Sequence, residues 1–265
     1  MSAGPTLVDR CVVGADVEAY GRRNVRQQRD IQRDLRVLMA EAAQAAGLDP
    51  TAWEVFPTGD GEHAVLPAGV NLLAVVGGFV PVLHDLLVLR NEDREPGAKI
   101  RLSVAVHTGA LTPGAGDRYA GVALLELGRL LDSTPVRRAL ARSDRSALAL
   151  ILSTAVYEKV VSSGLLVVRD GDFAEVEVEE RPPGEGVRWA AYVHVPGQDM
   201  RTLAPEVLDP GGMSGASPPP GRARPPGVQA GPGAIVVNGD FVVGGNVDTS
   251  ITTHLGPGAH GEAPL

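Results

Sequence analysis

Cysteine is nearly absent from this chain: Cys11 is the only one in 265 residues. A single cysteine excludes an intrachain disulfide and any zinc site that is built from several cysteines. Cys11 stands inside an apolar run with no base beside it in the sequence. We therefore expect a small buried side chain at this position rather than a nucleophile.

Positive charge is also scarce. The net charge is −8, and lysine occurs only at Lys99 and Lys159. A protein that binds DNA or RNA needs a basic face or a basic domain to neutralise phosphates, and none stands out in this sequence. We expect no nucleic-acid partner.

Long uninterrupted hydrophobic runs are missing as well. The longest apolar stretch, residues 70–89, contains two glycines, a proline, a histidine and an aspartate, so it predicts a buried helix rather than a membrane span. Residues 1–9 lack the basic segment and apolar core of a signal peptide. These absences predict a cytoplasmic protein without a membrane partner.

Apolar residues nevertheless make up 44% of the chain, which is enough for one sizeable core. Their periodicity predicts strands at 10–16, 53–56, 63–66, 100–107, 147–152, 165–168, 173–178 and 189–195. It predicts helices at 22–46, 71–90, 122–131, 135–141 and 153–161, with a loop over 109–121. The order indicates an α+β fold on a ferredoxin-like β-α-β-β-α-β core with extra strands.

Composition divides the chain into four parts. Residues 9–197 are expected to form the folded domain, and residues 198–232, dense in proline and glycine, a disordered linker. Apolar β-branched residues return at 233–256, which we expect to be a short β-prone motif for self-assembly or docking. Residues 257–265 are expected to be a disordered end.

Two aspartates stand where predicted strands end. Asp16 closes the first strand, and Asp60 lies in the Asp-Gly turn between strands 53–56 and 63–66. If these strands are neighbours in one sheet, the two carboxylates meet and need a cation. Hard oxygen ligands suit Mg²⁺ or Mn²⁺, which neutralise phosphate charge in phosphoryl transfer. The alternative is that Asp16 is a helix N-cap and Asp60 an ordinary turn residue.

Several segments, in this order, resemble motifs of the class III nucleotidyl cyclases. Residues 15–20 resemble the first metal motif, 58–65 the second metal hairpin, 101–109 the strand that follows, and 119–131 the helix with the transition-state arginine. Segments 151–161 and 192–197 also resemble divergent actinobacterial cyclase-like proteins of unassigned role. The resemblance covers most of residues 9–197 and implies the nucleotidyl cyclase fold, a nucleoside triphosphate ligand and a head-to-tail homodimer.

The resemblance assigns two metal ions, Mg²⁺ or Mn²⁺, to Asp16 and Asp60 with the backbone of Val17. It assigns the transition-state arginine to Arg129, which would act across the dimer.

The chain departs from the family where the base is read. Phe56 stands in place of the purine-reading lysine, Arg118 in place of its acidic partner, and Leu125 in place of the ribose-orienting asparagine. Phe56, Arg118 and Gly59 are the residues expected beside the nucleotide. The sequence thus keeps the metal ligands and loses the base-reading pair.

Three histidines are weaker candidates. His63 follows the hairpin turn and His107 ends a strand, and we interpret both as structural or solvated residues. His84 lies in the apolar helix 71–90 and is expected to be a core histidine with its hydrogen bonds satisfied.

The tail holds two β-branched runs within residues 234–247 and a third at 251–255. Short, nearly uncharged runs of this kind stack into cross-β arrays, and the tail resembles bacterial amyloid signalling motifs. The residues expected in such an assembly are Val236, Val237, Asn238, Phe241, Val243 and Asn246. The alternative is a β-hairpin that docks on the same chain.

Three functions remain open from the sequence. The first is a divergent signalling module, in a bacterial defence or signalling pathway, that binds metal–nucleotide and is clustered through its tail by copies or by a partner protein with a matching motif. The second is an active cyclase with altered base choice, and the third is a catalytically dead scaffold.

Overall fold

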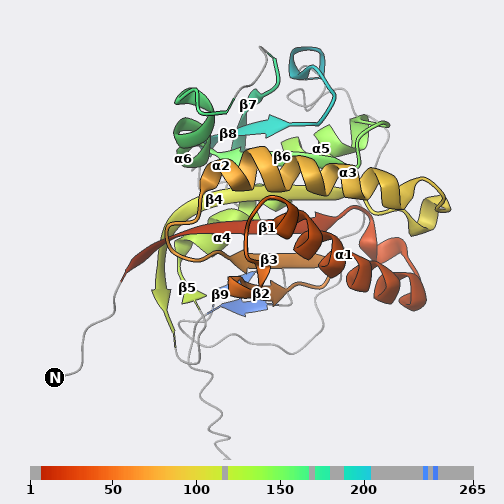
Figure 1. The fold of residues 1–265 in the computed structure, drawn as a ribbon, viewed down its shortest axis with the longest axis horizontal. Coiled ribbons are helices and arrows are strands. Elements are labelled where there is room, and N and C mark those ends of the chain that lie inside the picture. Colours follow the sequence, from red (N-terminus) through yellow and green to blue (C-terminus); the bar gives the residue numbers. More distant parts are fainter. Residues whose placement is uncertain are drawn as a thin grey trace, which may run out of the picture.

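The computed structural model of the chain describes residues 7–114, 119–166, 171–179 and 188–203, and the backbone of 235–237 and 241–243. Figure 1 shows helices on both faces of one twisted sheet. The strands of this sheet follow the order β2-β3-β1-β4-β6-β8-β7, and β5 pairs with β4. Their bounds are β1 Val8–Val17, β2 Glu54–Pro57, β3 Gly61–Val65, β4 Leu102–Pro113, β5 Tyr119–Ala120, β6 Leu148–Ser153, β7 Ala174–Glu179 and β8 Arg188–His194.

Two helical layers enclose the sheet. Helix α1 (Val25–Ala45) and the continuous helix formed by α2 (Leu72–Ala74), the π-helical turn η3 (Val75–Phe79) and α3 (Val80–Asn91) cover one face. The short helix α6 (Thr154–Tyr157) and its π-helical turn η5 (Glu158–Ser162) join that layer. Helices α4 (Val122–Asp132) and α5 (Thr134–Arg142) cover the other face. Single 3₁₀ turns lie at Tyr20–Arg22, Pro50–Ala52 and Pro96–Ala98.

Strand β1 shows why the sheet has two buried faces. Cys11, Val13 and Ala15 belong to the core under α1 and α3, whereas Val12 belongs to the core under α4. Successive side chains of a strand alternate between faces, so an unbroken apolar run is what a doubly covered central strand requires. Burial raises the pKa of the Cys11 thiol to about 12, which confirms a buried, unreactive cysteine.

The α+β fold predicted from the sequence is confirmed, and the differences are local. The loop expected over residues 109–121 is wrong, because β4 continues to Pro113 and pairs with β5. Gly109 and Gly121 bound this segment at positions where a side chain would crowd its neighbours. A Cβ on Gly109 would lie 3.0 Å from the Ala123 Cβ, and a Cβ on Gly121 would lie 2.9 Å from the Ala110 carbonyl oxygen. A strand was expected at residues 165–168, but Leu165 and Leu166 are not in a strand. Residues 167 and 168 lie outside the described residues.

The apolar helix Leu72–Asn91 is long and apolar enough to cross a membrane by length and composition alone, with a mean hydropathy of 2.2. Within the fold, however, Val75, Phe79, Leu83 and Leu87 are fully buried against the core. This is the position of a core helix, as the interruptions of the sequence predicted.

Two features extend beyond residue 197. Met200 is fully buried in the α4 side of the core, and its N–H donates to the Gly171 carbonyl at 2.7 Å. Strands β9 (Ile235–Val237) and β10 (Phe241–Val243) form a separate antiparallel pair, with Val237 opposite Phe241. Asn238 and Asn246 of the expected assembly motif, and the rest of the linker, lie outside the described residues.

Candidate functional site

The two predicted metal aspartates lie together. Strand β3 is hydrogen-bonded to β1, with Gly61 opposite Asp16, and the Val17 N–H donates to the Asp60 carbonyl at 2.9 Å. The carboxyl groups of Asp16 and Asp60 are within hydrogen-bonding distance of each other. The sheet therefore places both acids at one point, which the sequence could only make conditional on strand order.

Glycine is required at the hairpin for this contact. A Cβ on Gly61 would lie 1.9 Å from the Ala15 carbonyl oxygen, which is backbone and has no freedom to move aside. The turn itself is closed by the Thr58 N–H, which donates to the Gly61 carbonyl at 2.9 Å. The close approach of the turn to β1 holds Asp60 over the end of that strand.

Asp16 is partly buried and Asp60 is exposed, and together they carry excess negative charge. Burial and the neighbouring Asp60 carboxyl raise the pKa of Asp16 well above its usual range. Arg137 of α5 opposes this shift, with a guanidinium nitrogen 3.5 Å from Asp16 Oδ2. Arg137 also pairs with Asp132 at the end of α4. Asp16 is therefore enclosed by two acids and a single arginine.

The donors fit a hard divalent cation. Carboxylate oxygens are the ligands of Mg²⁺ and Mn²⁺, and a second positive charge would relieve the repulsion that raises the pKa of Asp16. No group of three or more His, Cys, Asp or Glu side chains that could hold a metal occurs among the described residues. A metal at this pair would need further ligands from a substrate phosphate, water or a backbone carbonyl such as that of Val17.

Arg129 belongs to α4, whereas Arg137 belongs to α5 of the same helical layer. Its guanidinium stands 5.8 Å from the ring centroid of Trp189 in β8, a cation–π contact. The cation that reaches Asp16 within the chain is Arg137 rather than Arg129. An Arg129 that acted on the carboxylate pair would therefore have to come from a second copy of the chain, as the resemblance implied.

The expected nucleotide residues are only partly described. Phe56 pairs with His63 across β2 and β3 and packs on the α4 side of the core. The Gly59 carbonyl accepts a hydrogen bond from Gln32 Nε2 at 3.4 Å in the hairpin turn. Arg118 lies outside the described residues. Phe56 and Gly59 thus belong to the two strands and the turn that carry Asp60.

The loop that follows Asp16 contains contacts that sequence reasoning missed. Glu18 pairs with Arg101 at 2.9 Å, and Arg101 also donates to the Ser143 carbonyl at 2.7 Å. Ala19 adopts a left-handed conformation with φ of 55°, an uncommon state for a residue other than glycine. Arg137 and Arg101 were not found from the sequence because each meets its partner only through tertiary packing.

The histidines differ in part from expectation. His63 is buried, and burial lowers its pKa to about 4, so it is a neutral structural residue. His107 is also buried and lies 2.8 Å from a carboxylate oxygen of Glu126. The expectation of a satisfied core histidine at His84 is wrong, because its Nε2 atom has no hydrogen-bond partner among the described residues.

Comparison with solved structures was made with this geometry in hand. The chain is similar to an adenylate/guanylate cyclase/hydrolase from Silicibacter pomeroyi, with 17% identity and a TM-score of 0.51 over 73% of this chain and 99% of that one. It is also similar to a bacterial light-regulated adenylyl cyclase, with 15% identity and a TM-score of 0.50 over 78% and 58% of the two chains. No family model and no curated protein matches the sequence. The likeness shows that the domain has the nucleotidyl cyclase fold.

Proposed function

We propose that this chain is a divergent cyclase-like signalling module that binds a metal–nucleotide complex at Asp16 and Asp60. The observation that carries the proposal is the contact between the partly buried Asp16 carboxyl and the exposed Asp60 carboxyl at the end of β1. A fold that needed only stability would gain nothing from two acids in mutual repulsion. Such a pair is the arrangement expected of a cation site.

The proposed site uses Asp16, Asp60 and the Val17 carbonyl to hold Mg²⁺ or Mn²⁺, two ions per site. Bound metal would neutralise triphosphate oxygens. Phe56 would stack on the base, and Arg129 of the partner copy would face the phosphates and offset the charge that develops there. Gly59 and Arg118 complete the proposed nucleotide contacts.

The main alternative is an active cyclase, in which the 3′-hydroxyl attacks the α-phosphorus and pyrophosphate leaves. Both metal aspartates and Arg129 are present, and this favours retained chemistry. A catalytically dead scaffold is the second alternative, favoured by Phe56 and Leu125 in place of the family's lysine and asparagine.

Incubation of the purified chain with each of the four ribonucleoside triphosphates and Mn²⁺ separates these functions. We expect all four to bind, with pyrimidine triphosphates bound at least as well as ATP, because an aromatic ring stacks on any base and the purine-reading lysine is absent. Binding is measured by calorimetry and cyclic products by mass spectrometry. Formation of a cyclic product would identify an active enzyme. Nucleotide binding without product would support the signalling module that binds nucleotide but does not turn it over. Selective turnover of ATP would contradict the expected base choice.

The proposed head-to-tail homodimer makes a separate prediction. Asp60→Ala and Arg129→Ala chains should each lose metal-dependent function, and their mixture should regain one working site per dimer because each contributes the residue that the other lacks. The measurement is nucleotide turnover, or binding if the chain is not a cyclase, in the mixture against each variant alone. A mixture that shows no recovery, beside a functional wild type, would rule out shared sites.

The remaining parts of the chain complete the proposal. We assign residues 9–197 to the cyclase-like domain of actinobacterial type, with residues 198–203 packed on it through Met200, and 204–232 to a flexible linker. Residues 233–256 would cluster the module with other copies or with a partner that carries a matching motif, and 257–265 would be a disordered end. The module would work in the cytoplasm, in a bacterial defence or signalling pathway, without a nucleic-acid or membrane partner.

A further inference from the structure

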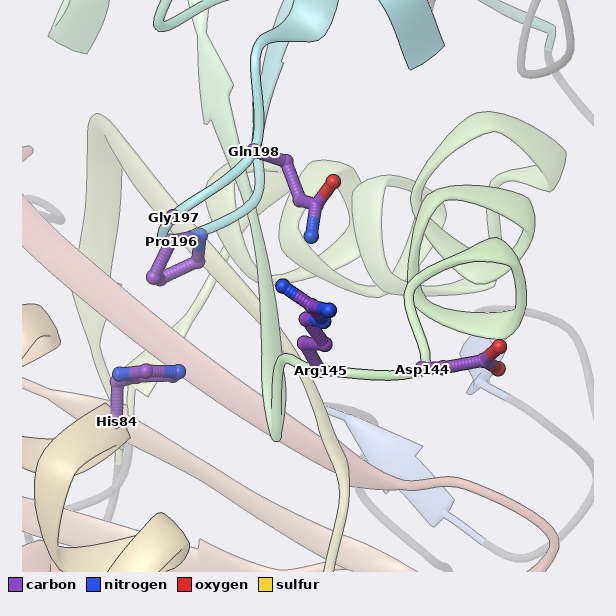
Figure 2. Close-up of a pocket in the computed structure, with 6 residues that line it drawn as sticks. All are labelled: His84, Asp144, Arg145, Pro196, Gly197 and Gln198. Carbon is purple, nitrogen blue, oxygen red and sulfur yellow. The ribbon is translucent and has the colours of Figure 1, made fainter.

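A second polar hollow lies apart from the carboxylate pair. It has a volume of about 560 Å³ and is lined by His84, Asp144, Arg145, Pro196, Gly197 and Gln198. These residues come from α3, from the loop before β6 and from the segment after β8, as Figure 2 shows. Strand β4 lies between β1, which carries Asp16, and β6 in the sheet, and the lining of the hollow includes none of the residues of the proposed nucleotide site.

Three polar side chains, those of His84, Arg145 and Gln198, line this hollow. In Figure 2 the side chains of His84 and Gln198 extend toward the guanidinium of Arg145 from two sides. The Nε2 atom of His84 is buried and has no hydrogen-bond partner within the described part of the chain. A buried polar atom without a partner is rare in a folded protein and indicates an unseen ligand or water.

The charge of these groups selects the class of ligand. Asp85 lies 3.3 Å from His84 Nδ1, so Nε2 is the ring nitrogen that is left for a ligand in the hollow. Arg145 adds a planar set of N–H donors, and the Gln198 amide adds further donors. The carboxylate of Asp144, the one acid of the lining, points away from this cluster in Figure 2. Arg145 supplies positive charge and Arg145 and Gln198 supply N–H donors, so these groups suit an anion with several acceptor oxygens.

We propose that His84, Arg145 and Gln198 form a binding site for a phosphate-class oxyanion, separate from the nucleotide site. Arginine makes charge-assisted hydrogen bonds to phosphate oxygens, and hydrogen bonds from the His84 ring and the Gln198 amide fix the orientation. The hollow is larger than one water molecule or one phosphate ion requires. It therefore has room for the small molecule that carries the phosphate group.

The test measures the binding of inorganic phosphate and of ribose 5-phosphate to the full metal-free chain by calorimetry. Arg145→Ala should weaken binding by about tenfold, the loss typical of one charge-assisted hydrogen bond, and His84→Ala should weaken it by a smaller factor. Arg94→Ala removes an exposed arginine from another part of the surface and should leave binding unchanged. Asp60→Asn should also leave it unchanged, which separates this site from the proposed nucleotide site.

The outcomes are distinct. Tighter binding of ribose 5-phosphate than of inorganic phosphate identifies a phosphorylated small molecule as the ligand, and equal binding identifies a free anion. Absence of binding to the wild type, or binding to Arg145→Ala as tight as to the wild type, overturns the proposal. Thermal unfolding of each variant checks the fold, and Arg145→Lys, which keeps the charge, should retain part of the affinity.

Discussion

Asp60→Asn is expected to abolish Mn²⁺-dependent nucleotide binding, with an affinity loss of at least about a hundredfold, because it removes a direct ligand from a site with two carboxylates. Arg137→Ala is the matched variant of opposite sign. It removes the arginine that lies 3.5 Å from Asp16 and competes with a cation for that carboxylate, so it should bind Mn²⁺ at least as tightly as the wild type. Electron paramagnetic resonance of free Mn²⁺ measures both variants.

Asp16, the other carboxylate of the pair, gives the metal-free protein a stability that depends on pH. The pKa of Asp16 is raised in the folded state, so between about pH 4 and pH 7 this carboxyl keeps its proton in the folded chain and loses it in the unfolded chain. The contribution of Asp16 to stability should therefore fall as the pH rises through this range, by up to about 1.4 kcal/mol per pH unit, whereas His63, whose pKa is lowered by burial, contributes with the opposite sign. Asp16→Asn should flatten this slope in denaturant unfolding. An unchanged slope, together with Mn²⁺ binding that survives Asp60→Asn, would argue against a cation site at this pair.

Val237→Asp is expected to block self-assembly of the tail completely. A peptide of residues 234–255 should form fibrils that bind thioflavin, because its short β-branched runs carry almost no charge and stack in register. Val237 lies opposite Phe241 in the β9–β10 pair. A carboxylate at this position would be repeated in every stacked copy, and like charges at the spacing of stacked strands repel strongly.

The control for the tail is Val237→Ile, which keeps a β-branched apolar side chain and should keep the fibrils. The domain for comparison should end after Leu203 rather than Gly197, because a cut at Gly197 removes the fully buried Met200. Such a domain should stay folded and should not assemble. A peptide that remains monomeric at high concentration would instead favour a hairpin that docks on its own chain.

The sequence by itself determined the class of the fold and most of its elements. Alternating or continuous apolar runs located β1, β3, β4 and β6, since a strand covered on both faces has few polar positions. The helix over residues 25–45 was recognised from its apolar stripe, and Asn24 and Gln27 close its first turn with a capping box. These signals are local, so they can be read without knowing the partners.

Only the tertiary structure decided which side chains meet. Asp16 and Asp60 lie 44 positions apart in the printed sequence, and their contact depends on the pairing of β1 with β3. Arg137, Arg101 and the hollow around His84 had no motif, because each is made by elements that adjoin only after the sheet has formed. Periodicity reports how a residue faces its own element, whereas the charge, burial and ligand preference of a site depend on neighbours contributed by strand order and helix packing.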